Sequence, residues 1–453
     1  MPSFSDLSIQ QLLGEGFDCA CGHHHGAELV SFHSGAGAIK MLPQALHEIG
    51  CKKPFVVCDQ HTYRAAGEQA VQILTDAGIE HVLFILPQDE VEPNEFSMGS
   101  IAMGFEPGLD VVLAIGSGVI NDCCKEFAHA ASLPSAVVAT APSMDGYASG
   151  SSSMLVNSVK STLYNSCPAA IILDSDILCQ APMRMLWSGL GDMIAKYVSI
   201  CEWRIAQLVV DEYYCPEIAA LMRRSLKRCV ENADRLKDRD PEVILAVTEG
   251  LVLSGIAMAF AGTSRPASGM EHYFSHMWEM MALERGEKSD FHGIQVGVGT
   301  VITLKLYDWI KQQQPDAERA RAHMAAFNER DWEAQVHRIF GQTTPQILAI
   351  EQKEHKNDPA KHEVRLEKII AHWQDILQII EEELPPTEQI VSLMQQLGAP
   401  MTNADLGISV QDTCDAFVGA RDIRNKYLGV SMLWDLGLID EARDVVKQIA
   451  QGE

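Results

Sequence analysis

The sequence is poor in basic residues. It has 35 Lys and Arg against 61 Asp and Glu, for a net charge of −26. Such a surface repels phosphate backbones, so no nucleic-acid partner is expected. The sequence also lacks the basic region and apolar stretch of a signal peptide, and it has no run of about eighteen apolar residues. A cytoplasmic protein without a membrane span is therefore expected.

No internal repeat and no low-complexity linker divides the 453 residues. This length exceeds that of one ordinary domain and favours two or three. Apolar residues make up 47% and charged residues 21%, which is a globular composition. The twelve cysteines are scattered and form no small-scaffold framework, so they are predicted to be reduced thiols, mostly buried.

Strand-like and helical runs alternate in the first part of the chain. Residues 62–78 between the first two strands have helical periodicity and end at Gly78, as helices often do. This rhythm predicts a doubly wound α/β domain over residues 28–175, preceded by an extension at residues 1–27. The five apolar runs predicted as strands are 54–59, 81–86, 110–116, 135–140 and 169–174.

After residue 176 strand-like runs almost vanish. Residues 242–260 are apolar nearly all round and include small residues, which predicts a buried helix. Residues 351–388 are charged and rich in helix formers, so they are interpreted as surface helices. Residues 176–453 are therefore predicted to form a second, helical domain.

The segment AIGSGVINDCCKEFAH places a Gly-x-Gly turn between a predicted strand and a predicted helix that carries Lys125. Glycines let backbone N–H groups approach a pyrophosphate, and the helix N-terminus adds partial positive charge. The segment departs from the G-x-G-x-x-G fingerprint, and a tight turn in any α/β protein explains it as well. Asp59, at the end of an earlier strand, fits either a ribose contact or an ordinary helix N-cap.

The segment TAPSMDGYASGSSSM, residues 140–154, is packed with hydroxyl groups and has one carboxylate. It follows a predicted strand, and ligands of α/β folds bind at the carboxyl ends of strands. The alternative is a solvated serine-rich loop.

Three histidines and one aspartate form a candidate metal set. His272 and His276 are four residues apart, hence on one face of a helix, and His292 opens a further helical segment. Asp192 lies in a glycine-flanked helical start. One carboxylate and two imidazoles with an open position suit a catalytic divalent metal. Taken singly, each histidine is more often a structural residue.

The segment CACGHHHG, residues 19–26, is rich in soft ligands. A closed zinc site normally has four ligands of recognisable spacing, and no second C-x-x-C or H-x-x-H lies nearby. A turn or hairpin that binds metal only adventitiously is the favoured interpretation, and a small structural zinc site is the lesser one. Catalysis is not expected here.

Five motifs in order carry a family resemblance. GSGVINDCCK, TAPSMDGYAS, SGLGDMIAK, SRPASGMEHYFSH and HGIQVG span residues 116–299. Together they resemble the iron-containing alcohol dehydrogenase superfamily, and within it the bacterial AraM-like glycerol-1-phosphate dehydrogenases. SRPASG-x-EH is narrow to this group.

The resemblance implies the dehydroquinate synthase-like fold: an α/β nucleotide-binding domain, an all-α C-terminal domain and an active site in the cleft between them. It implies reversible reduction of dihydroxyacetone phosphate, a phosphorylated triose, to sn-glycerol 1-phosphate with NAD(H) or NADP(H). It further implies a homodimer and a role in phospholipid biosynthesis.

Carried over by position, the resemblance assigns Asp192, His272 and His292 to a metal, which is zinc or nickel, with iron possible. It assigns Asp145 to the substrate hydroxyls and His276 to substrate contact or proton relay. Where the family usually has a third glycine, this chain has Ser117. The residues implied to line the nicotinamide cofactor are Gly116, Ser117, Gly118, Asn121, Asp122, Thr140, Ser143 and Ser149, with Asp59 as the ribose candidate.

Three other functions are weighed. A glycerol or other polyol dehydrogenase would use the same site without a phosphate requirement. A dehydroquinate synthase-like lyase also uses bound nicotinamide, but by resemblance its first metal ligand is a glutamate, where this chain has Asp192. A non-catalytic binding protein is disfavoured by the complete metal set. Lys160 and Arg265 are candidates for the substrate phosphate, although either suits a surface or structural role.

Overall fold

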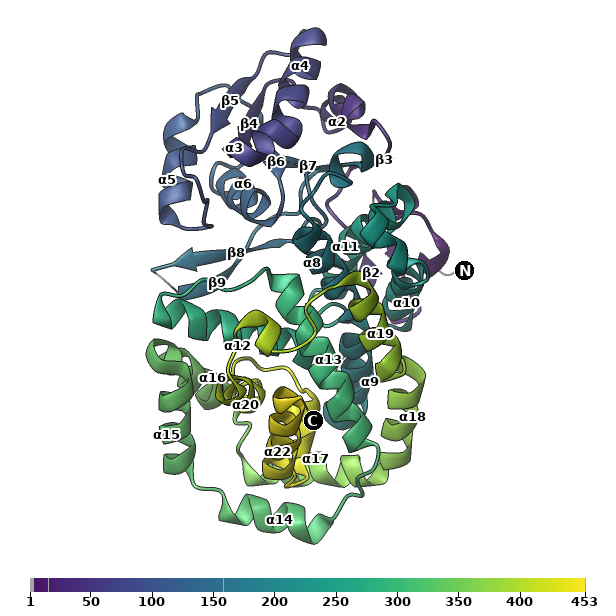
Figure 1. Ribbon diagram of the computed structural model, residues 1–453, viewed down its shortest axis with the longest axis vertical. Helices are drawn as coiled ribbons and strands as arrows, with labels where there is room; N and C mark the ends of the chain where they lie inside the picture. The colour runs from purple at the N-terminus through teal and green to yellow at the C-terminus, as the bar shows by residue number, and fades with distance from the viewer. Residues whose placement is uncertain (1–3, 15, 158, 453) are drawn as a thin grey trace. The chain divides into compact units, whose positions relative to one another are not determined.

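The computed structural model describes residues 4–14, 16–157 and 159–452 (Figure 1). These residues group into two compact units, each with its own internal packing. The domain limits expected from the sequence, at residues 27 and 175, stay predictions. The first unit comprises Met1–Met193 and Cys215–Pro266, and the second comprises Ile194–Tyr214 and Ala267–Glu453.

A six-stranded parallel sheet forms the centre of the first unit, in the order β3-β10-β7-β6-β4-β5. The five predicted strands are all present, each within one residue of its expected ends. The edge strand β3 was not predicted. The strands are β3 (Ser31–Gly35), β4 (Pro54–Cys58), β5 (Val82–Ile85), β6 (Val111–Gly116), β7 (Ser135–Ala139) and β10 (Ala170–Asp174).

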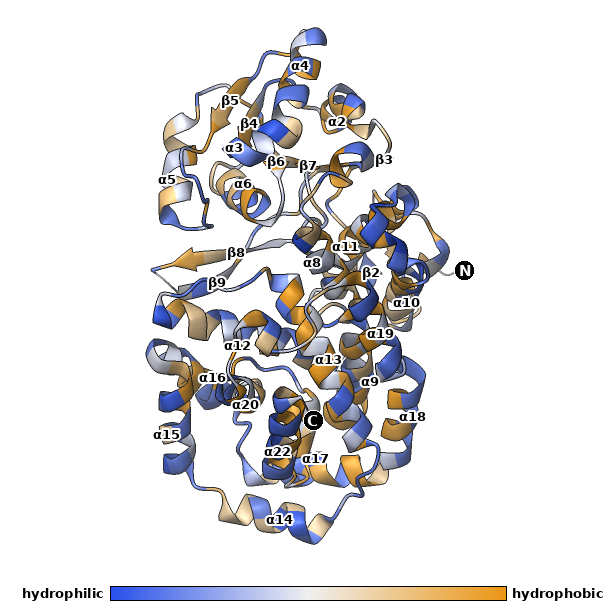
Figure 2. Ribbon diagram, in the orientation of Figure 1, coloured by the Kyte–Doolittle hydropathy of each residue, from blue (hydrophilic) through white to orange (hydrophobic). Residues whose placement is uncertain are grey.

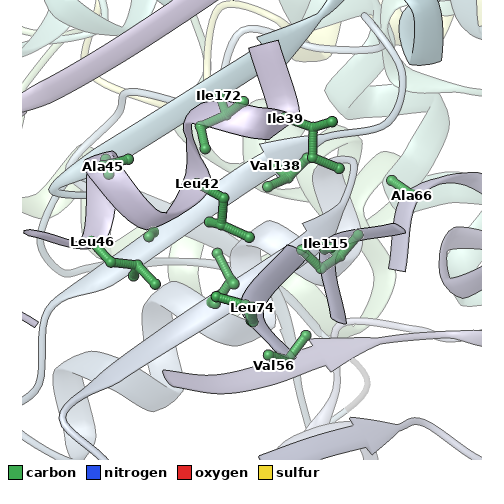
Figure 3. Packing of buried hydrophobic residues seen from close by; sticks show 14 of the residues in the cluster. Ile39, Leu42, Ala45, Leu46, Val56, Ala66, Leu74, Ile115, Val138 and Ile172 are labelled. Carbon is green, nitrogen blue, oxygen red and sulfur yellow. The ribbon is translucent and has the colours of Figure 1, made fainter. Parts of the chain in front are cut away.

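Both faces of this sheet are covered, so its central strands are buried along their whole length and mostly apolar (Figure 2). Val56 and Val138 lie on one face, in a buried cluster with the helices η2 (Ala38–Met41), α2 (Leu42–Glu48) and α4 (Glu68–Asp76) (Figure 3). On the other face the ring of Phe55 lies 6.2 Å from that of Phe127 in helix α6 (Gly118–Ala130). Alternate residues of each strand therefore belong to different layers.

Two short hairpins accompany the sheet in the first unit. The strands β1 (Phe17–Asp18) and β2 (His24–His25) pair antiparallel, which confirms the hairpin interpretation of that segment. The strands β8 (Ser151–Val156) and β9 (Val159–Tyr164) form the other hairpin, which was not predicted. The remaining helical elements of this unit are η1 (Phe4–Asp6), α1 (Ile9–Leu12), α3 (Gln60–Thr62), η3 (Tyr63–Gly67), α5 (Glu95–Gly104), α7 (Ser175–Leu178), α8 (Met183–Ile194), α10 (Pro216–Val230), η4 (Ala233–Asp238) and α11 (Pro241–Ala261).

Helix α11 confirms the predicted buried helix. Among the described residues it alone has the length and composition to cross a membrane, with a mean hydropathy of 2.1 in its most apolar window. Yet 78% of that window is buried inside the protein, as in the core helix of a globular protein, so it is weak evidence for a span. All twelve cysteines are described and free of disulfides, and nine are buried.

The second unit is helical, and no strand follows Asp174 in the described part of the chain. Helix α12 packs against α13 and α20. Its elements are α9 (Lys196–Val210), α12 (Met270–Arg285), α13 (His292–Ile310), α14 (Ala317–Ala326), α15 (Glu329–Phe340), η5 (Gly341–Thr343), α16 (Thr344–Glu354), α17 (Pro359–Ala371), α18 (Trp373–Glu383), α19 (Thr387–Leu397), η6 (Ala404–Leu406), α20 (Val410–Gly419), α21 (Gly429–Asp435) and α22 (Ile439–Gln451).

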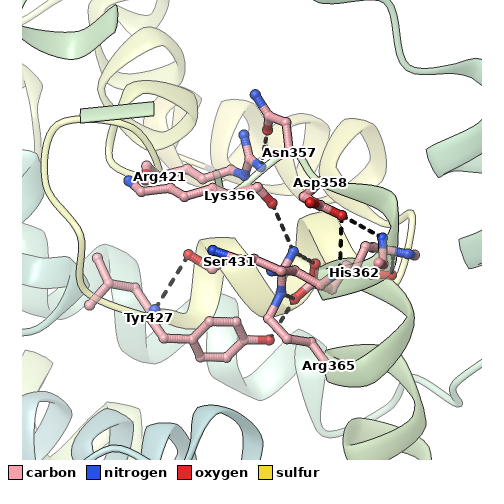
Figure 4. Close-up of polar contacts among 12 residues, drawn as sticks. Lys356, Asn357, Asp358, His362, Arg365, Arg421, Tyr427 and Ser431 are labelled. Carbon is pink, nitrogen blue, oxygen red and sulfur yellow. Dashed lines mark hydrogen bonds and ion pairs between the residues drawn. The ribbon is translucent and has the colours of Figure 1, made fainter. Parts of the chain in front are cut away.

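The charged segment at residues 351–388 is helical, as predicted, and one of its helices is anchored by a buried carboxylate. The guanidinium of Arg365 in α17 donates two hydrogen bonds of 2.8 Å to Asp435. The hydroxyl of Tyr427 donates to the same carboxylate at 2.9 Å, and Figure 4 shows the neighbouring contacts. Because Asp435 is 1% exposed, this pairing satisfies a charge that would otherwise be costly to bury.

Candidate functional site

The strand order of the first unit reverses between β4 and β6. The chain runs from β4 outward to β5 and then returns to β6 on the other side of β4. In open α/β sheets, ligands bind outside the carboxyl ends of the strands at such a reversal. Asp59 directly follows β4 and Gly116 ends β6, so two predicted cofactor residues lie at neighbouring strand ends.

The turn from β6 into α6 requires its glycines. A Cβ on Gly116 would lie 2.6 Å from the Cβ of Ile120, closer than real contacts allow. A Cβ on Gly118 would lie 3.2 Å from the side chain of Met144. The thirteen-residue helix α6 starts at Gly118, so its first N–H groups face the end of the sheet. This arrangement suits a pyrophosphate.

Asp59 is the N-cap of α3. Its carboxylate accepts from the backbone N–H of Thr62 at 2.7 Å and from the hydroxyl of that residue at 3.0 Å. Asp59 thus has the helix N-cap role that its position in the sequence allows. Its ribose contact stays a prediction.

The hydroxyl of Ser117 is directed into the protein. Its partners are the hydroxyls of Ser143 and Tyr147 and the carbonyl oxygen of Ala141. The N–H of Thr140 donates to the carbonyl of Gly116 at 3.1 Å. These contacts bind the β6–α6 turn to the loop after β7, so the serine that replaces the usual glycine is accommodated.

Lys125 is fully buried and fixes the rest of that loop. Its ammonium donates to the carbonyl oxygens of Gly146, Ser149 and Ser151, at 3.1, 3.1 and 2.5 Å, and to the Ser149 hydroxyl at 3.1 Å. The Asn121 amide also reaches the Gly146 carbonyl, at 3.5 Å. The hydroxyl-rich segment is therefore a well-packed loop followed by strand β8, rather than a solvated serine-rich loop.

Asp122 completes this buried group. Its carboxylate lies 3.6 Å from the Lys125 ammonium and accepts the N–H of Ser153 in β8 at 3.1 Å. Burial raises the pKa of Asp122 and lowers that of Lys125, and the opposite charge of each partner counters both shifts. The carboxylate thus anchors the β8–β9 hairpin, while its cofactor role stays a prediction.

Helix α8 packs against the same loop through a very close contact. A Cβ on Gly189 would lie 2.0 Å from the carbonyl oxygen of Pro142, which only glycine tolerates. The hydroxyl of Ser188 donates to the carbonyl of Ser143 at 2.6 Å. One turn on, the buried carboxylate of Asp192 accepts the N–H of Asp145 at 2.8 Å. Three residues of the SGLGD motif, Ser188, Gly189 and Asp192, therefore contact the loop at residues 140–150.

Helix α11 supports the loop from a further direction. The hydroxyl of Ser254 donates to the Asp145 carboxylate at 2.8 Å. A Cβ on Gly255 would lie 2.8 Å from the backbone of Ala148, so backbone and helix are in contact there. Asp145, the predicted substrate residue, is thus fixed at its backbone by Asp192 and at its side chain by Ser254.

The second unit brings the three predicted histidines together. The ring of His292 lies 5.4 Å from that of His272 and 5.4 Å from that of His276. His272 and His276 project from α12, and His292 is the first residue of α13. These helices approach closely because Gly299 lies against the Glu271 carbonyl, 2.4 Å from where a Cβ would be.

Two glutamates orient these imidazoles. Glu271 lies 2.8 Å from Nδ1 of His272, and Glu279 lies 3.1 Å from Nδ1 of His292 and 3.5 Å from Nδ1 of His276. A carboxylate can only accept, so each of these Nδ1 atoms donates and Nε2 carries the lone pair. Carboxylates placed behind histidines in this way are typical of metal sites. The Ser275 hydroxyl adds a contact of 3.1 Å to His292.

A second buried carboxylate, Glu202, lies near Glu271. Glu202 accepts the N–H of Met270 at 2.8 Å, and Tyr307 donates to it at 2.9 Å. A Cβ on Gly269 would lie 2.6 Å from Glu271 and 2.8 Å from Glu202, so this glycine admits both carboxylates. Burial and the nearby Glu271 raise the pKa of Glu202 from 4.5 to about 7.

The metal set expected from the sequence draws on both units, with Asp192 in the first and His272 and His292 in the second. As a set it stays a prediction. So do the phosphate candidates Lys160 and Arg265, of which Arg265 is 1% exposed. The supporting residues that sequence analysis did not assign are Tyr147, Ser188, Glu202, Ser254, Glu271, Ser275 and Glu279. Tyr147, Ser188, Glu271 and Ser275 lie within the quoted motifs, and Glu279 lies three residues after His276.

Comparison with known proteins shows the family to which the chain belongs. The family model described as iron-containing alcohol dehydrogenase matches residues 33–182. A curated protein of Halalkalibacterium halodurans named glycerol-1-phosphate dehydrogenase [NAD(P)+] is 30% identical over 413 residues, which cover 90% of this chain and 93% of the relative. The chain belongs to the glycerol-1-phosphate dehydrogenase family. A relative of the same name from Geobacillus stearothermophilus is 29% identical, covering 89% and 92% of the two chains.

Solved structures share the fold of this family member at low identity. Glycerol dehydrogenase from Schizosaccharomyces pombe aligns with a TM-score of 0.62 at 15% identity, over 94% of this chain and 90% of that one. An archaeal alcohol dehydrogenase from a Red Sea brine pool aligns with a TM-score of 0.59 at 16% identity, over 95% and 98%. The predicted fold class, an α/β domain followed by an all-α domain, is confirmed.

Gly189→Ala is expected to destabilise the protein by on the order of 3 kcal/mol, because the new methyl group would overlap the Pro142 carbonyl. The matched control is Gly99→Ala in α5, where nothing lies within 4 Å of the added Cβ. That control should gain about 1 kcal/mol from helix propensity. Urea unfolding of both variants gives the comparison, and equal effects would contradict the close packing of α8.

Glu202→Gln tests the buried carboxylate. The folded protein retains a proton on Glu202 that the unfolded chain releases between pH 4.5 and 7. This group's contribution to stability is therefore greatest below pH 4.5 and is lost as the pH rises to 7. Over that range the wild type should lose about 3 kcal/mol relative to the glutamine variant, from the size of the shift. Urea unfolding at a series of pH values measures this, and parallel curves would refute it.

Proposed function

We propose that this chain catalyses the metal- and NAD(P)H-dependent reversible reduction of dihydroxyacetone phosphate to sn-glycerol 1-phosphate. The substrate assignment is supported by the shared name of relatives that match nine-tenths of the chain. The observation that carries the chemistry is the pair of adjacent imidazoles, His272 and His292, oriented through Nδ1 by the buried Glu271 and the half-buried Glu279 respectively.

The donor set suits a divalent metal. His272 and His292 would hold it through Nε2, together with the carboxylate of Asp192, and this leaves a position for substrate. When bound, the metal supplies Lewis acidity toward the ketone and the nicotinamide supplies the hydride. One carboxylate and two imidazoles accept zinc, nickel or iron, and zinc or nickel is proposed.

The chain's own residues bind, orient and transfer the proton. Asp145 accepts hydrogen bonds from substrate hydroxyls, because Asp192 and Ser254 fix its backbone and carboxylate. His276 protonates the product oxygen, directly or through one water, since an imidazole titrates in the physiological range. Glu279 holds His276 and His292 in one orientation. Lys160 and Arg265 remain the candidates for the substrate phosphate.

The nicotinamide dinucleotide, NAD(H) or NADP(H), would lie at the carboxyl edge of the sheet. The N-terminus of α6 suits its pyrophosphate, and Asp59 suits its ribose. Asn121, Thr140, Ser143 and Ser149 are the further contacts proposed from the family motif. We also propose a cytoplasmic homodimer that acts in phospholipid biosynthesis.

The test follows nucleotide oxidation by purified protein after chelation, with zinc or nickel restored. Turnover of dihydroxyacetone phosphate should return with the metal, while the unphosphorylated dihydroxyacetone should react poorly. Chiral analysis should find sn-glycerol 1-phosphate as the product. Turnover of dihydroxyacetone alone would instead assign a polyol dehydrogenase. No turnover of either ketone, with metal bound, would favour the lyase or a binding protein.

His292→Ala is expected to lose the catalytic metal and about 100- to 1000-fold in kcat/KM, because removal of an electrostatic contact at the reacting oxygen has this order of effect. Its circular dichroism should match that of the wild type. The control is His372→Ala, at the start of α18, where the half-buried histidine pairs with the exposed Asp375 at 2.8 Å. Full activity of the metal-free His292 variant would overturn the ligand assignment.

A further inference from the structure

Four potential metal ligands meet in the first unit, apart from the residues assigned to catalysis. They are Cys19, Cys21 and His25 of the N-terminal hairpin and Cys215, about 190 residues later. Their ligand atoms all lie within 4.8 Å of one another. His25 and Cys215 are fully buried, and the two hairpin cysteines are half-buried.

The distances match a tetrahedron around one ion. A zinc ion with Zn–S bonds of about 2.3 Å and Zn–N bonds of about 2.0 Å has S–S edges of about 3.8 Å and S–N edges of about 3.5 Å. The sulfurs of Cys19 and Cys215 lie 3.7 Å apart. The Nε2 atom of His25 lies 3.3 Å from the Cys21 sulfur and 3.6 Å from the Cys215 sulfur.

The imidazole of His25 is oriented for a ligand on its Nε2 side. Its Nδ1 lies 2.8 Å from the carbonyl oxygen of Phe260, at the end of α11. A carbonyl only accepts, so Nδ1 carries the proton and Nε2 the lone pair. The rings of Phe4 and Phe260 pack beside it, at 5.6 and 5.8 Å.

The backbone presents all three cysteines to the same point. Cys19 and Cys21 lie in the turn of the β1–β2 hairpin, where Gly22 adopts a positive φ of 88° and donates to the Cys19 carbonyl at 3.0 Å. Cys215 is the N-cap of the fifteen-residue helix α10, which fixes its position at the start of that helix.

We propose that Cys19, Cys21, His25 and Cys215 bind one structural zinc ion. Three thiolates and one imidazole in tetrahedral array select zinc among the common divalent ions. Four protein ligands leave no open position, so the site is structural. It would fasten the hairpin to the start of α10 and, through the Phe260 carbonyl, to the end of α11. The latter helix carries Ser254, which holds Asp145.

Cobalt substitution of the reduced full-length protein provides a test that is separate from activity. Thiolate ligands give Co²⁺ an intense charge-transfer absorption in the near ultraviolet, which a site of two histidines and one aspartate does not give. The wild type and the His292→Ala variant should both show this absorption at one equivalent of cobalt per chain. Failure of the catalytic proposal would leave this result unchanged.

Paired variants locate the site. Cys21→Ser and Cys215→Ser should lose the absorption and about one zinc per chain by elemental analysis, and His25→Ala should weaken both. The control for the cysteines is Cys179→Ser, at the end of α7. The control for the histidines is His24→Ala, an exposed neighbour of His25 that pairs with Asp18 at 3.0 Å. Both controls should retain full metal.

Three results would overturn the proposal. One is a wild-type protein without thiolate-to-cobalt absorption, which needs no variant to fold. Another is metal that disappears with His24→Ala but survives Cys21→Ser, since this would assign adventitious binding to the histidine run. The last is a Cys19–Cys215 disulfide after purification under reducing conditions, detected as a mass two hydrogens too low and located by peptide mapping.

Discussion

The loop at residues 140–150 packs against helices α8 and α11. The position of Asp145 in this loop depends on how closely the helix backbones can approach the loop backbone. Gly189 of α8 and Gly255 of α11 contact the loop with no room for a Cβ. From α6, the buried Lys125 ammonium donates to three backbone carbonyl groups at the end of this loop and the start of β8. These constraints fix Asp145 before any ligand binds, so in its proposed role as a substrate contact it would add little to the entropy cost of binding.

Most of the sheet could be predicted because its strands are apolar on both faces. The edge strand β3 was missed since its sequence, SFHSG, is largely polar, and edge position tolerates this. The β8–β9 hairpin was missed because serine-rich strands look like loops. Its pairing depends on Lys125 and Asp122, whose contacts are separated from the hairpin along the chain and invisible to periodicity.

The candidate site likewise contains residues that could be predicted from the sequence and residues that could not. Family motifs supplied the histidines, and the structure gathers His272, His276 and His292 in one unit. The glutamates behind them were not predicted, because burial of a carboxylate follows from tertiary packing alone. The CACGHHHG segment was judged by local spacing, which finds no fourth ligand. Cys215 lies far away in sequence, and only its position as a helix N-cap brings it to the hairpin.

The first unit is discontinuous, since residues 215–266 complete a body that begins at the N-terminus. During synthesis the sheet can form early, but Asp145 has no Ser254 to hold it until α11 has left the ribosome. At elongation rates of about 5–20 residues per second this interval lasts several seconds or more. The strongly apolar α11 is synthesised after the sheet and helices of the first unit against which it packs. It can therefore be buried soon after it leaves the ribosome, which leaves little time for aggregation.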